Sequence, residues 1–457
     1  MIRRRTQTFP RNAERGVTML LVVIAMLSML AMVALAIDVI TLYSARSETQ
    51  RVADAAALAA AKALVDGGVT GDPSNSAGTY TSAQTLATQA AKDVGSQLSI
   101  AGRQVQAGDV TAVYSNTGNP NFGVNPQVTV TVQNAYLPAF FSRIWNRSPL
   151  TVSASATAEA FNPSNSGTGT PVIAKCVKPF IIPNCDPVNA NNKAPTTCGG
   201  TFATFFSPTT GAITNPGVAP TGVIGEEFDL VSNCGPGPGC TPGTPSVNPA
   251  GPGGPTVYFY PAVLPSPANA CPSCAGATNF EQDIECCNPS PISCGTTATA
   301  PIVDTLTVDT TVYPEGGGGP AQEGVQCLIH QTGGSGMDTL NSGPPLTYPL
   351  QIQVGNGNPA RSTNLSANDY VTTSDSLVTI PVYDNVALAA APTAASNLNI
   401  IGFLQVFIVQ SFPGGGGPKA GEFHVKVVNV SGCGSSATGT AVAGAGTSAV
   451  PIRLIHQ

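Results

Sequence analysis

Cysteine is the residue type here that could do the most chemistry, and it is confined to one region. A Cys-x-x-Cys pair at Cys271 and Cys274, followed by Cys286, Cys287 and Cys294, could supply the four thiolates of a compact zinc site. An even number of cysteines confined to one region also fits disulfides in an oxidising compartment. The twelve candidate disulfide cysteines are Cys176, Cys185, Cys198, Cys234, Cys240, Cys271, Cys274, Cys286, Cys287, Cys294, Cys327 and Cys433.

The histidines form no catalytic or metal-binding motif. His330, His424 and His456 have no second histidine and no carboxylate at a ligand spacing along the chain, and the sequence contains no His-Glu-x-x-His, Gly-x-Ser-x-Gly or phosphate-binding loop. Cys327 lies near His330, but a structural cysteine beside an exposed histidine is the simpler interpretation. We therefore expect no enzymatic activity, no metal site and no cofactor, which disfavours a periplasmic hydrolase or a metal-dependent binder.

Composition points to an exported protein of strands and loops. Of the 457 residues only 10% are charged and 6% are aromatic, while there are 49 glycines and 40 prolines. Soluble cytosolic domains usually carry about 25% charged residues. The formal net charge of −6 argues against nucleic acid as a partner, because no excess of basic groups is available to displace counterions from phosphates.

The N-terminus contains an apolar run of membrane-spanning length. Val17 to Ile37 is 21 residues without a charge, and as a helix it would extend roughly 31 Å, about the thickness of a bilayer's hydrocarbon core. Positive residues stay cytoplasmic, so we expect a single-pass membrane protein with its N-terminus in the cytoplasm. Residues 1–16 would be cytoplasmic, 17–37 would span the bilayer, and the bulk of the chain would be periplasmic or extracellular. The basic residues before the run are Arg3, Arg4, Arg5, Arg11 and Arg15.

Two other interpretations of this run have less support. A buried core helix seldom stays apolar on all sides for so long. Ala34-Leu35-Ala36 offers a small-x-small site for signal-peptide cleavage, although the helical pattern continues through it, so cleavage stays open. With the cysteines outside the cytoplasm, disulfides are favoured over zinc. Cys286 and Cys287 should then pair with different partners, because a bridge between neighbours is strained.

The helical pattern continues far beyond the span. No proline or glycine occurs from Asp38 to Val65, so the sequence predicts one helix of about 48 residues that ends before Gly67. Eight of the fourteen residues in Arg51–Leu64 are alanine. Small residues let another backbone approach closely, and we expect this face to pack against other subunits. It comprises Leu42, Ala45, Thr49, Val52, Ala56, Ala59 and Ala63.

A small helix-and-sheet unit should occupy residues 38–162. Thr81 and Gln84 could form a capping box at the start of a second helix. Alternating apolar residues then predict strands near Val110–Tyr114, Val128–Val132 and Val152–Ala160. A short apolar helix is expected at LPAFFSRIWNRSP. A long helix that leads into a small sheet has the shape of a pilin.

The remaining residues, 163–457, are rich in glycine, proline and cysteine and should be mainly β. Their spacing favours a β-sandwich or a comparable all-β unit, subdivided near 300–345. The fold class expected for the whole chain is therefore α+β and membrane-anchored. The strand candidates are Val257–Tyr260, Leu350–Val354, Leu377–Tyr383, Ile400–Val409 and Phe423–Val430.

The N-terminal segment resembles TadG-like proteins of the Tad, or Flp, pilus-assembly systems. The shared features are Arg15-Gly16, the apolar span, Ala36-Ile37-Asp38, the Leu42-Tyr43 pair and the alanine-rich run that contains Asp54. The resemblance is specific over about residues 15–65. It implies a role in assembling or anchoring a pilus-type secretion apparatus and no enzymatic activity.

Two features of related proteins are missing. Prepilins are cut after a glycine with Glu five residues beyond the cut, but Leu21 holds that position after Gly16, so we expect no such processing. Some TadG proteins carry a von Willebrand A-type domain with an Asp-x-Ser-x-Ser metal site. Asp72-Pro73-Ser74-Asn75-Ser76 fits literally, but glycines rather than an apolar strand precede it, so a turn is the better interpretation.

Two acidic residues on the long helix each have a structural and a functional interpretation. Asp38 either marks the end of the span or contacts a basic group of a partner subunit. Asp54 is either solvated or sets the register of an assembly. The expected partners are the inner membrane, other pilin-like subunits and further copies of the chain; a surface adhesin that uses the helix only as an anchor is the alternative. The candidate assembly contacts are Asp38, Leu42, Tyr43, Ala45, Val52, Asp54, Ala56, Ala59, Ala60 and Ala63.

Overall fold

The computed structural model forms two compact units. Unit 1 comprises Met1–Ala56, Ala91–Ala112 and Val130–Ala156, and unit 2 comprises Ala57–Ala90, Val113–Thr129 and Thr157–Gln457. The domain boundaries expected at 37/38, at 162/163 and near 300–345 stay predictions. The described residues are 12–73, 78–115, 125–137, 150–165, 169–189, 196–198, 202–251, 253–265, 271, 278–295, 301–314, 319–331, 336–341, 350–358, 361, 366, 369–371, 373–386, 388, 390–412, 421–443 and 448–455.

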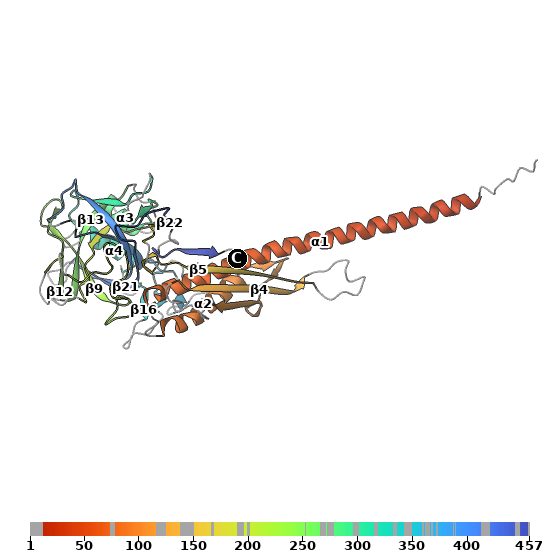
Figure 1. The fold of residues 1–457 in the computed structure, drawn as a ribbon, viewed down its shortest axis with the longest axis horizontal. Helices are drawn as coiled ribbons and strands as arrows, with labels where there is room; N and C mark the ends of the chain where they lie inside the picture. The colour runs from red at the N-terminus through yellow and green to blue at the C-terminus, as the bar shows by residue number, and fades with distance from the viewer. Residues whose placement is uncertain are drawn as a thin grey trace, which may run out of the picture. The chain divides into compact units, whose positions relative to one another are not determined.

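The N-terminal helix α1 runs without interruption from Asn12 to Asp66, as Figure 1 shows in red. This confirms the prediction of one long helix. It ends because Gly68 adopts a left-handed φ of +74°, and a Cβ there would lie 3.0 Å from the Val428 carbonyl oxygen. The apolar part of α1 has a mean hydropathy of 2.9 and is almost entirely exposed, so α1 is long and apolar enough to cross a membrane.

The second helix and a small sheet follow. Helix α2 spans Thr79–Ser96, so Thr81 lies in its first turn and the capping box expected at Thr81 and Gln84 is wrong. The sheet has the order β23-β5-β4-β3, and the three strands predicted from alternation are confirmed as β3 to β5. The C-terminal strand β23 was not predicted. The bounds are β3 Val110–Tyr114, β4 Gln127–Leu137, β5 Leu150–Ala160 and β23 Ile452–Ile455.

Six strands of unit 2 close into a barrel, so the expected β-sandwich is wrong. Their order is β7-β19-β20-β21-β9-β13, and β13 pairs again with β7. The short strand β7 closes the barrel because each of its two edges pairs with a different strand. It pairs in parallel with β19 and antiparallel with β13. Closure leaves these six strands without a free edge between them. The bounds are β7 Phe180–Pro183, β9 Glu227–Ser232, β13 Gly254–Val263, β19 Leu377–Tyr383, β20 Asn397–Ser411 and β21 Phe423–Gly432.

Aromatic side chains fill the core of the barrel. The rings of Phe180 and Phe259 lie 4.9 Å apart, as do those of Phe180 and Phe423. Helices α3 (Asn279–Glu285) and α4 (Pro320–Leu328) pack against each other and against this core, and Phe280 lies 6.2 Å from Phe180. Figure 1 labels both helices within the part of unit 2 that contains the barrel strands.

Shorter elements complete the chain. The strand expected at Leu350–Val354 is confirmed as the three-residue β17. The helix expected at LPAFFSRIWNRSP lies almost entirely outside the described residues, as do Ser74–Ser76 and His456. The remaining elements are η1 Val69–Gly71, β1 Ser99–Ile100, β2 Arg103–Gln104, η2 Ala107–Asp109, η4 Pro163–Asn165, β6 Val172–Ala174, β8 Thr196–Thr197, β10 Cys234–Gly235, β11 Thr241–Pro242, β12 Ser246–Gly251, β14 Ile292–Ser293, β15 Thr305–Val308, β16 Thr339–Asn341, β17 Gln351–Gln353, β18 Tyr370–Val371 and β22 Val442–Ala443.

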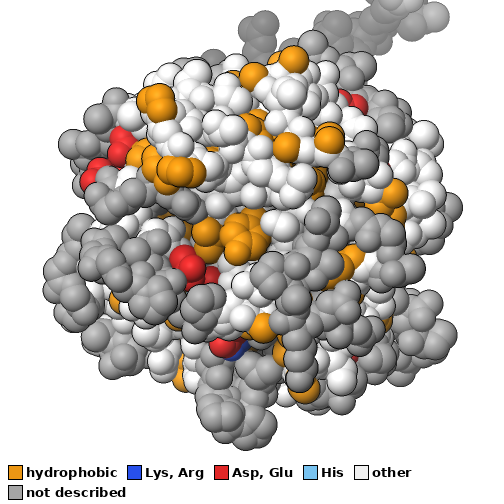
Figure 2. Space-filling model, turned by 90° about the vertical axis from the view of Figure 1, so that its left-hand side faces the viewer, with side chains coloured by type: hydrophobic (Ala, Val, Ile, Leu, Met, Phe, Trp, Pro, Cys, Tyr) orange, Lys and Arg blue, Asp and Glu red, His pale blue; other side chains and the backbone are white. Residues whose placement is uncertain are grey.

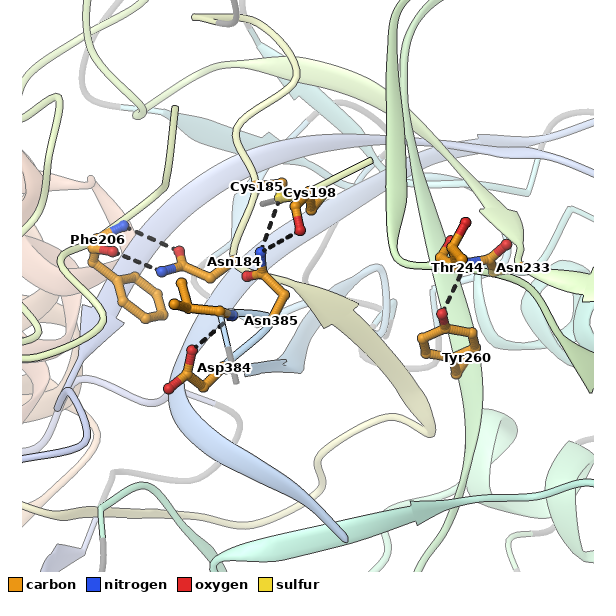
Figure 3. The surroundings of a disulfide bond; sticks show 10 residues. Asn184, Cys185, Cys198, Phe206, Asn233, Thr244, Tyr260, Asp384 and Asn385 are labelled. Carbon is orange, nitrogen blue, oxygen red and sulfur yellow. Dashed lines mark hydrogen bonds between the residues drawn. A yellow bond between two sulfur atoms is a disulfide. The ribbon is translucent and has the colours of Figure 1, made fainter. Parts of the chain in front are cut away.

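Every described cysteine is disulfide-bonded. The adjacent Cys286 and Cys287 pair with different partners, as predicted, and the zinc alternative is wrong for the described cysteines because no thiolate among them is free. Figure 3 shows Asn385 donating hydrogen bonds to the Cys185 sulfur and the Cys198 carbonyl oxygen. Cys274 lies outside the described residues. The five bridges that join two described cysteines are Cys176–Cys287, Cys185–Cys198, Cys234–Cys240, Cys271–Cys286 and Cys294–Cys433, and Cys327 is disulfide-bonded as well.

The bridges should differ in how much they stabilise the fold. Cys294 and Cys433 are 139 residues apart, whereas Cys234 and Cys240 are 6 apart. From loop-closure entropy, replacing both members of a pair with serine should lower the free energy of unfolding by about 5 kcal/mol for the long loop and about 2 kcal/mol for the short one. Denaturant unfolding of the two double variants tests this. An equal loss in both would contradict the entropic account.

Candidate functional site

The residues proposed for assembly lie on two opposite faces of α1. One face, which we call the alanine face, comprises Ala45, Val52, Ala56, Ala60 and Ala63, and all five are buried. The outward stripe comprises Ile40, Tyr43, Ser47, Arg51, Asp54 and Leu58, and all six are exposed or half-buried. Both sets recur at spacings of three and four, as the helical period requires. The sequence predicted the alanine face and assigned it to packing against other subunits, but it did not predict the outward stripe.

The alanine face is buried by the protein's own chain. In unit 1, Glu48 accepts a hydrogen bond from the Ala101 backbone nitrogen at 2.6 Å, and Gln50 donates one to the Ser155 carbonyl oxygen at 3.3 Å. These contacts hold α1 against the β1–β2 turn and against β5. Small side chains permit this approach between helix and strands just as they would permit approach to another helix.

The outward stripe keeps the features expected of a contact surface. Tyr43 is 70% exposed and Ile40 is 68% exposed. Asp54 is half-buried and accepts a hydrogen bond from Gln50 at 2.8 Å, so it stays on the accessible side of the helix. Leu42 and Ala59 are half-buried at the border between the faces. For these residues, assembly contact stays a prediction.

Asp38 is largely buried, and both interpretations offered for it stay predictions. Its exposed fraction is 8%, and Ala34, one turn earlier on the same face, is 7% exposed. The apolar residues Ile37, Val39 and Ile40 around it are exposed. Asp38 therefore lies on the covered side of α1, where the alanine face begins, and does not project freely from the end of the span.

The C-terminal end of α1 is held in unit 2 by buried amides. Asn429 of β21 donates hydrogen bonds to the Val65 carbonyl oxygen at 2.5 Å and to Gln405 at 2.9 Å. Asn162 donates to the Val430 carbonyl oxygen at 2.8 Å and lies 3.4 Å from the Thr70 carbonyl oxygen. These bonds satisfy helix-end and loop carbonyls that would otherwise be buried without a partner. We call Asn429, Gln405, Asn162 and Thr70 the amide lock.

Comparison with known proteins supports the resemblance noted in the sequence. Residues 16–63 match the family described as "Putative Flp pilus-assembly TadE/G-like". The matched segment is 48 of the 457 residues. It coincides with the part of α1 that carries the apolar run, the outward stripe and the alanine face. No curated protein and no solved structure matches the chain.

Outside the Tad segment, the barrel carries an ion network that the sequence did not reveal. His424 of β21 contacts Asp229 at 2.7 Å and Glu227 at 3.5 Å, and Lys426 contacts Glu227 at 2.6 Å. The pairing of β21 with β9 sets His424 opposite Asp229 and Lys426 opposite Glu227. These residues are about 195 positions apart, so no local spacing could have shown the pairing.

Neighbouring groups of opposite charge shift the pKa values of His424 and Glu227 in this network. Hydrogen bonds and attraction from Asp229 and Glu227 outweigh burial and raise the pKa of His424 to about 9. The hydrogen bond from His424 is the largest cause that lowers the pKa of Glu227 to about 2. Because both ring nitrogens of His424 face carboxylates, the network has the form of a structural ion cluster.

A second buried cation lies beside two disulfides. The Lys178 ammonium donates to the carbonyl oxygens of Ile284 at 2.5 Å and Cys286 at 2.8 Å. It therefore satisfies carbonyls at the C-terminal end of α3. Burial lowers its pKa to about 8. The adjacent pocket, which Asp375 and Cys287 also line, measures about 90 Å³, well below the roughly 300 Å³ at which ligand pockets begin.

The surface of unit 2 shows few charges. In Figure 2, the face toward the viewer carries scattered hydrophobic side chains, a few acidic ones and little basic surface among the residues that are drawn in colour. This agrees with the low charged fraction of the chain.

Bulky substitutions on the alanine face should now affect folding first. Ala60 is fully buried, whereas Ala55 on the same helix is half-buried. Ala60→Leu should lower the free energy of unfolding by about 1–3 kcal/mol through overpacking. Ala55→Leu, which makes the same chemical change toward the outward side, should cost much less. Denaturant unfolding of the two variants measures the difference, and equal stability would show that the alanine face is not packed as described.

The ion network should make stability depend on pH. Because the folded-state pKa of His424 is about 9 and its ordinary value is 6.5, its stabilising contribution is fully present below pH 6.5 and is lost as the pH rises through 9. Relative to wild type, His424→Gln should reduce the free energy of unfolding by about 1–3 kcal/mol near pH 6. The two profiles should converge above pH 9. A constant difference across the range would exclude titration of His424 as the cause.

Proposed function

We propose that this protein is a non-enzymatic, single-pass component of a Tad/Flp-type pilus assembly or secretion apparatus in the bacterial inner membrane. The match of residues 16–63 to the TadE/G-like family is the observation that carries this proposal. Tad pilus-assembly proteins are generally non-enzymatic. The proposed topology has residues 1–16 in the cytoplasm, α1 across the membrane and the barrel in the periplasm.

Several physical features support this topology. The apolar part of α1 is almost completely exposed in the folded chain, so it needs an apolar environment such as a bilayer. Five arginines precede it, which favours a cytoplasmic N-terminus. The disulfides of unit 2 are stable in an oxidising compartment such as the periplasm.

The outward stripe is the surface that we propose for subunit contact. Tyr43 and Ile40 are large apolar residues that lie exposed just beyond the predicted span. Arg51 and Asp54 follow on the same stripe and could set the register by pairing with opposite charges. The expected partners are other pilin-like subunits, or further copies of this chain, that carry a similar helix. In this proposal the alanine face holds α1 to its own sheet so that the opposite stripe is presented.

Site-specific photocrosslinking in the native membrane tests the proposal. A photoreactive residue in place of Tyr43 should give an adduct with a pilin-like membrane subunit or with a second copy, identified by mass spectrometry. The matched control replaces Tyr370 of β18, which is 53% exposed in unit 2, and should give no such adduct.

The opposite pattern would support a different function. If Tyr43 gives no subunit adduct while the barrel binds a surface or glycan in the absence of pilus components, α1 is only an anchor and the protein is an adhesin. Removing Asp54 with Asp54→Asn should weaken the Tyr43 adduct if the charge sets the register, and should leave it unchanged if Asp54 is merely solvated.

A further inference from the structure

Two buried carboxyl groups meet at one end of the barrel. Asp186 lies in the loop after β7, and Glu226 immediately precedes β9. Because β7 and β9 run in opposite directions on either side of β13, the end of one lies near the start of the other. Asp186 is fully buried and Glu226 is 1% exposed. Among the described residues, no lysine or arginine forms an ion pair with either carboxyl.

Two asparagine side chains converge on the same point. Asp186 Oδ2 lies 2.9 Å from Asn189 Nδ2 and 3.3 Å from Asn215 Nδ2, and Glu226 Oε1 lies 2.5 Å from Asn189 Nδ2. Asp186 Oδ1 accepts from the backbone nitrogens of Val188 at 2.9 Å and Asn189 at 3.0 Å. The nitrogen and oxygen of an asparagine amide are interchangeable by a 180° rotation. Rotating both amides would place an oxygen of Asn189 beside both carboxyls and an oxygen of Asn215 beside Asp186.

One of the two oxygens of the Glu226 carboxyl makes no hydrogen bond. Glu226 Oε2 is buried and has no hydrogen-bond partner, and the carboxyl contacts Asp186 as well as Asn189. Two carboxyl groups in contact in a buried position repel each other unless a proton or a cation lies between them. A buried carboxylate oxygen without a hydrogen-bond partner, on a carboxyl group beside a second carboxyl, is the kind of ligand that a hard cation takes.

The loop that carries Asp186 is firmly held. The preceding Cys185 is bridged to Cys198, and Asn184 exchanges hydrogen bonds with the backbone of Phe206 at 2.7 and 3.3 Å, as Figure 3 shows. At the other side, the Gly225 backbone nitrogen donates to the Val427 carbonyl oxygen at 2.8 Å and fixes the start of β9. The carboxyl pair is therefore positioned by covalent and backbone bonds and cannot easily separate.

We propose that Asp186, Asn189, Asn215 and Glu226 form a binding site for a divalent cation, with Ca²⁺ as the preferred ion. All four supply oxygen atoms, which suits a hard cation. Their polar atoms lie 2.5–3.3 Å apart, close to the spacing of oxygens that share an ion at about 2.4 Å. Ligands from loops suit Ca²⁺ better than Mg²⁺, which demands near-ideal octahedral geometry. Bound Ca²⁺ would join the loop after β7 to the start of β9 and stabilise that end of the barrel.

Calorimetric titration of the full-length protein in detergent, with CaCl₂ after removal of metals by EDTA, tests the proposal. The expected result is one Ca²⁺ per chain and a rise of several degrees in the thermal midpoint at saturating Ca²⁺, because an ion that binds only the folded state stabilises it. MgCl₂ at the same concentration should give a smaller rise.

Variants separate the cation from a shared proton. Glu226→Gln and Asp186→Asn should abolish the Ca²⁺-induced rise, whereas Glu323→Gln, which removes an exposed carboxylate from α4, should retain it. If the variants do not fold, the wild-type titration decides alone. The proposal is overturned if Ca²⁺ neither binds nor raises the midpoint of the wild type. A Glu226→Gln variant that is more stable than the wild type in the presence of Ca²⁺ would also overturn it, because the pair would then hold a proton.

Discussion

The packing of the alanine face of α1 against its own chain is the interaction on which the architecture depends. Beyond its apolar run, each face of α1 is either covered by the rest of the chain or left exposed. Ala56 and Ala60 have so little side chain that strands can approach the helix backbone closely. One face is therefore buried by folding, and the opposite stripe from Ile40 to Leu58 stays exposed or half-buried.

The amide lock carries this constraint into unit 2. Val65 ends the buried part of α1, and its carbonyl oxygen is bound by Asn429, a residue of the barrel strand β21. Asn429 also donates to Gln405, whose Nε2 is buried without a hydrogen-bond partner. The end of α1 is therefore bonded directly to a strand of the barrel.

The polar clusters of the barrel all have a tertiary origin. His424 meets Asp229 across two paired strands, and Asp186 meets Glu226 across one end of the barrel. Lys178, which lies just before β7, donates a hydrogen bond to the Ile284 carbonyl oxygen at the end of α3. Local motif spacing detects chemistry only when the ligands are close in sequence. Clusters built from single residues on separate strands have no local motif spacing. This is why the sequence showed no histidine or carboxylate motif here.

Sequence by itself determined α1, its apolar span, the resemblance of residues 16–63 to the TadE/G-like family, the alternation of β3 to β5 and most barrel strands. Each of these depends on local periodicity or on the absence of helix breakers. Only the tertiary structure decided that β7 closes a barrel instead of a sandwich, that β23 returns to the small sheet, and that the alanine face turns inward. The physical reason is that a pattern of small or apolar residues predicts that a surface will be buried, but it does not identify the element that will cover it. Pairing partners are chosen by the whole fold, because the free energy of burying a face depends on every strand that can reach it.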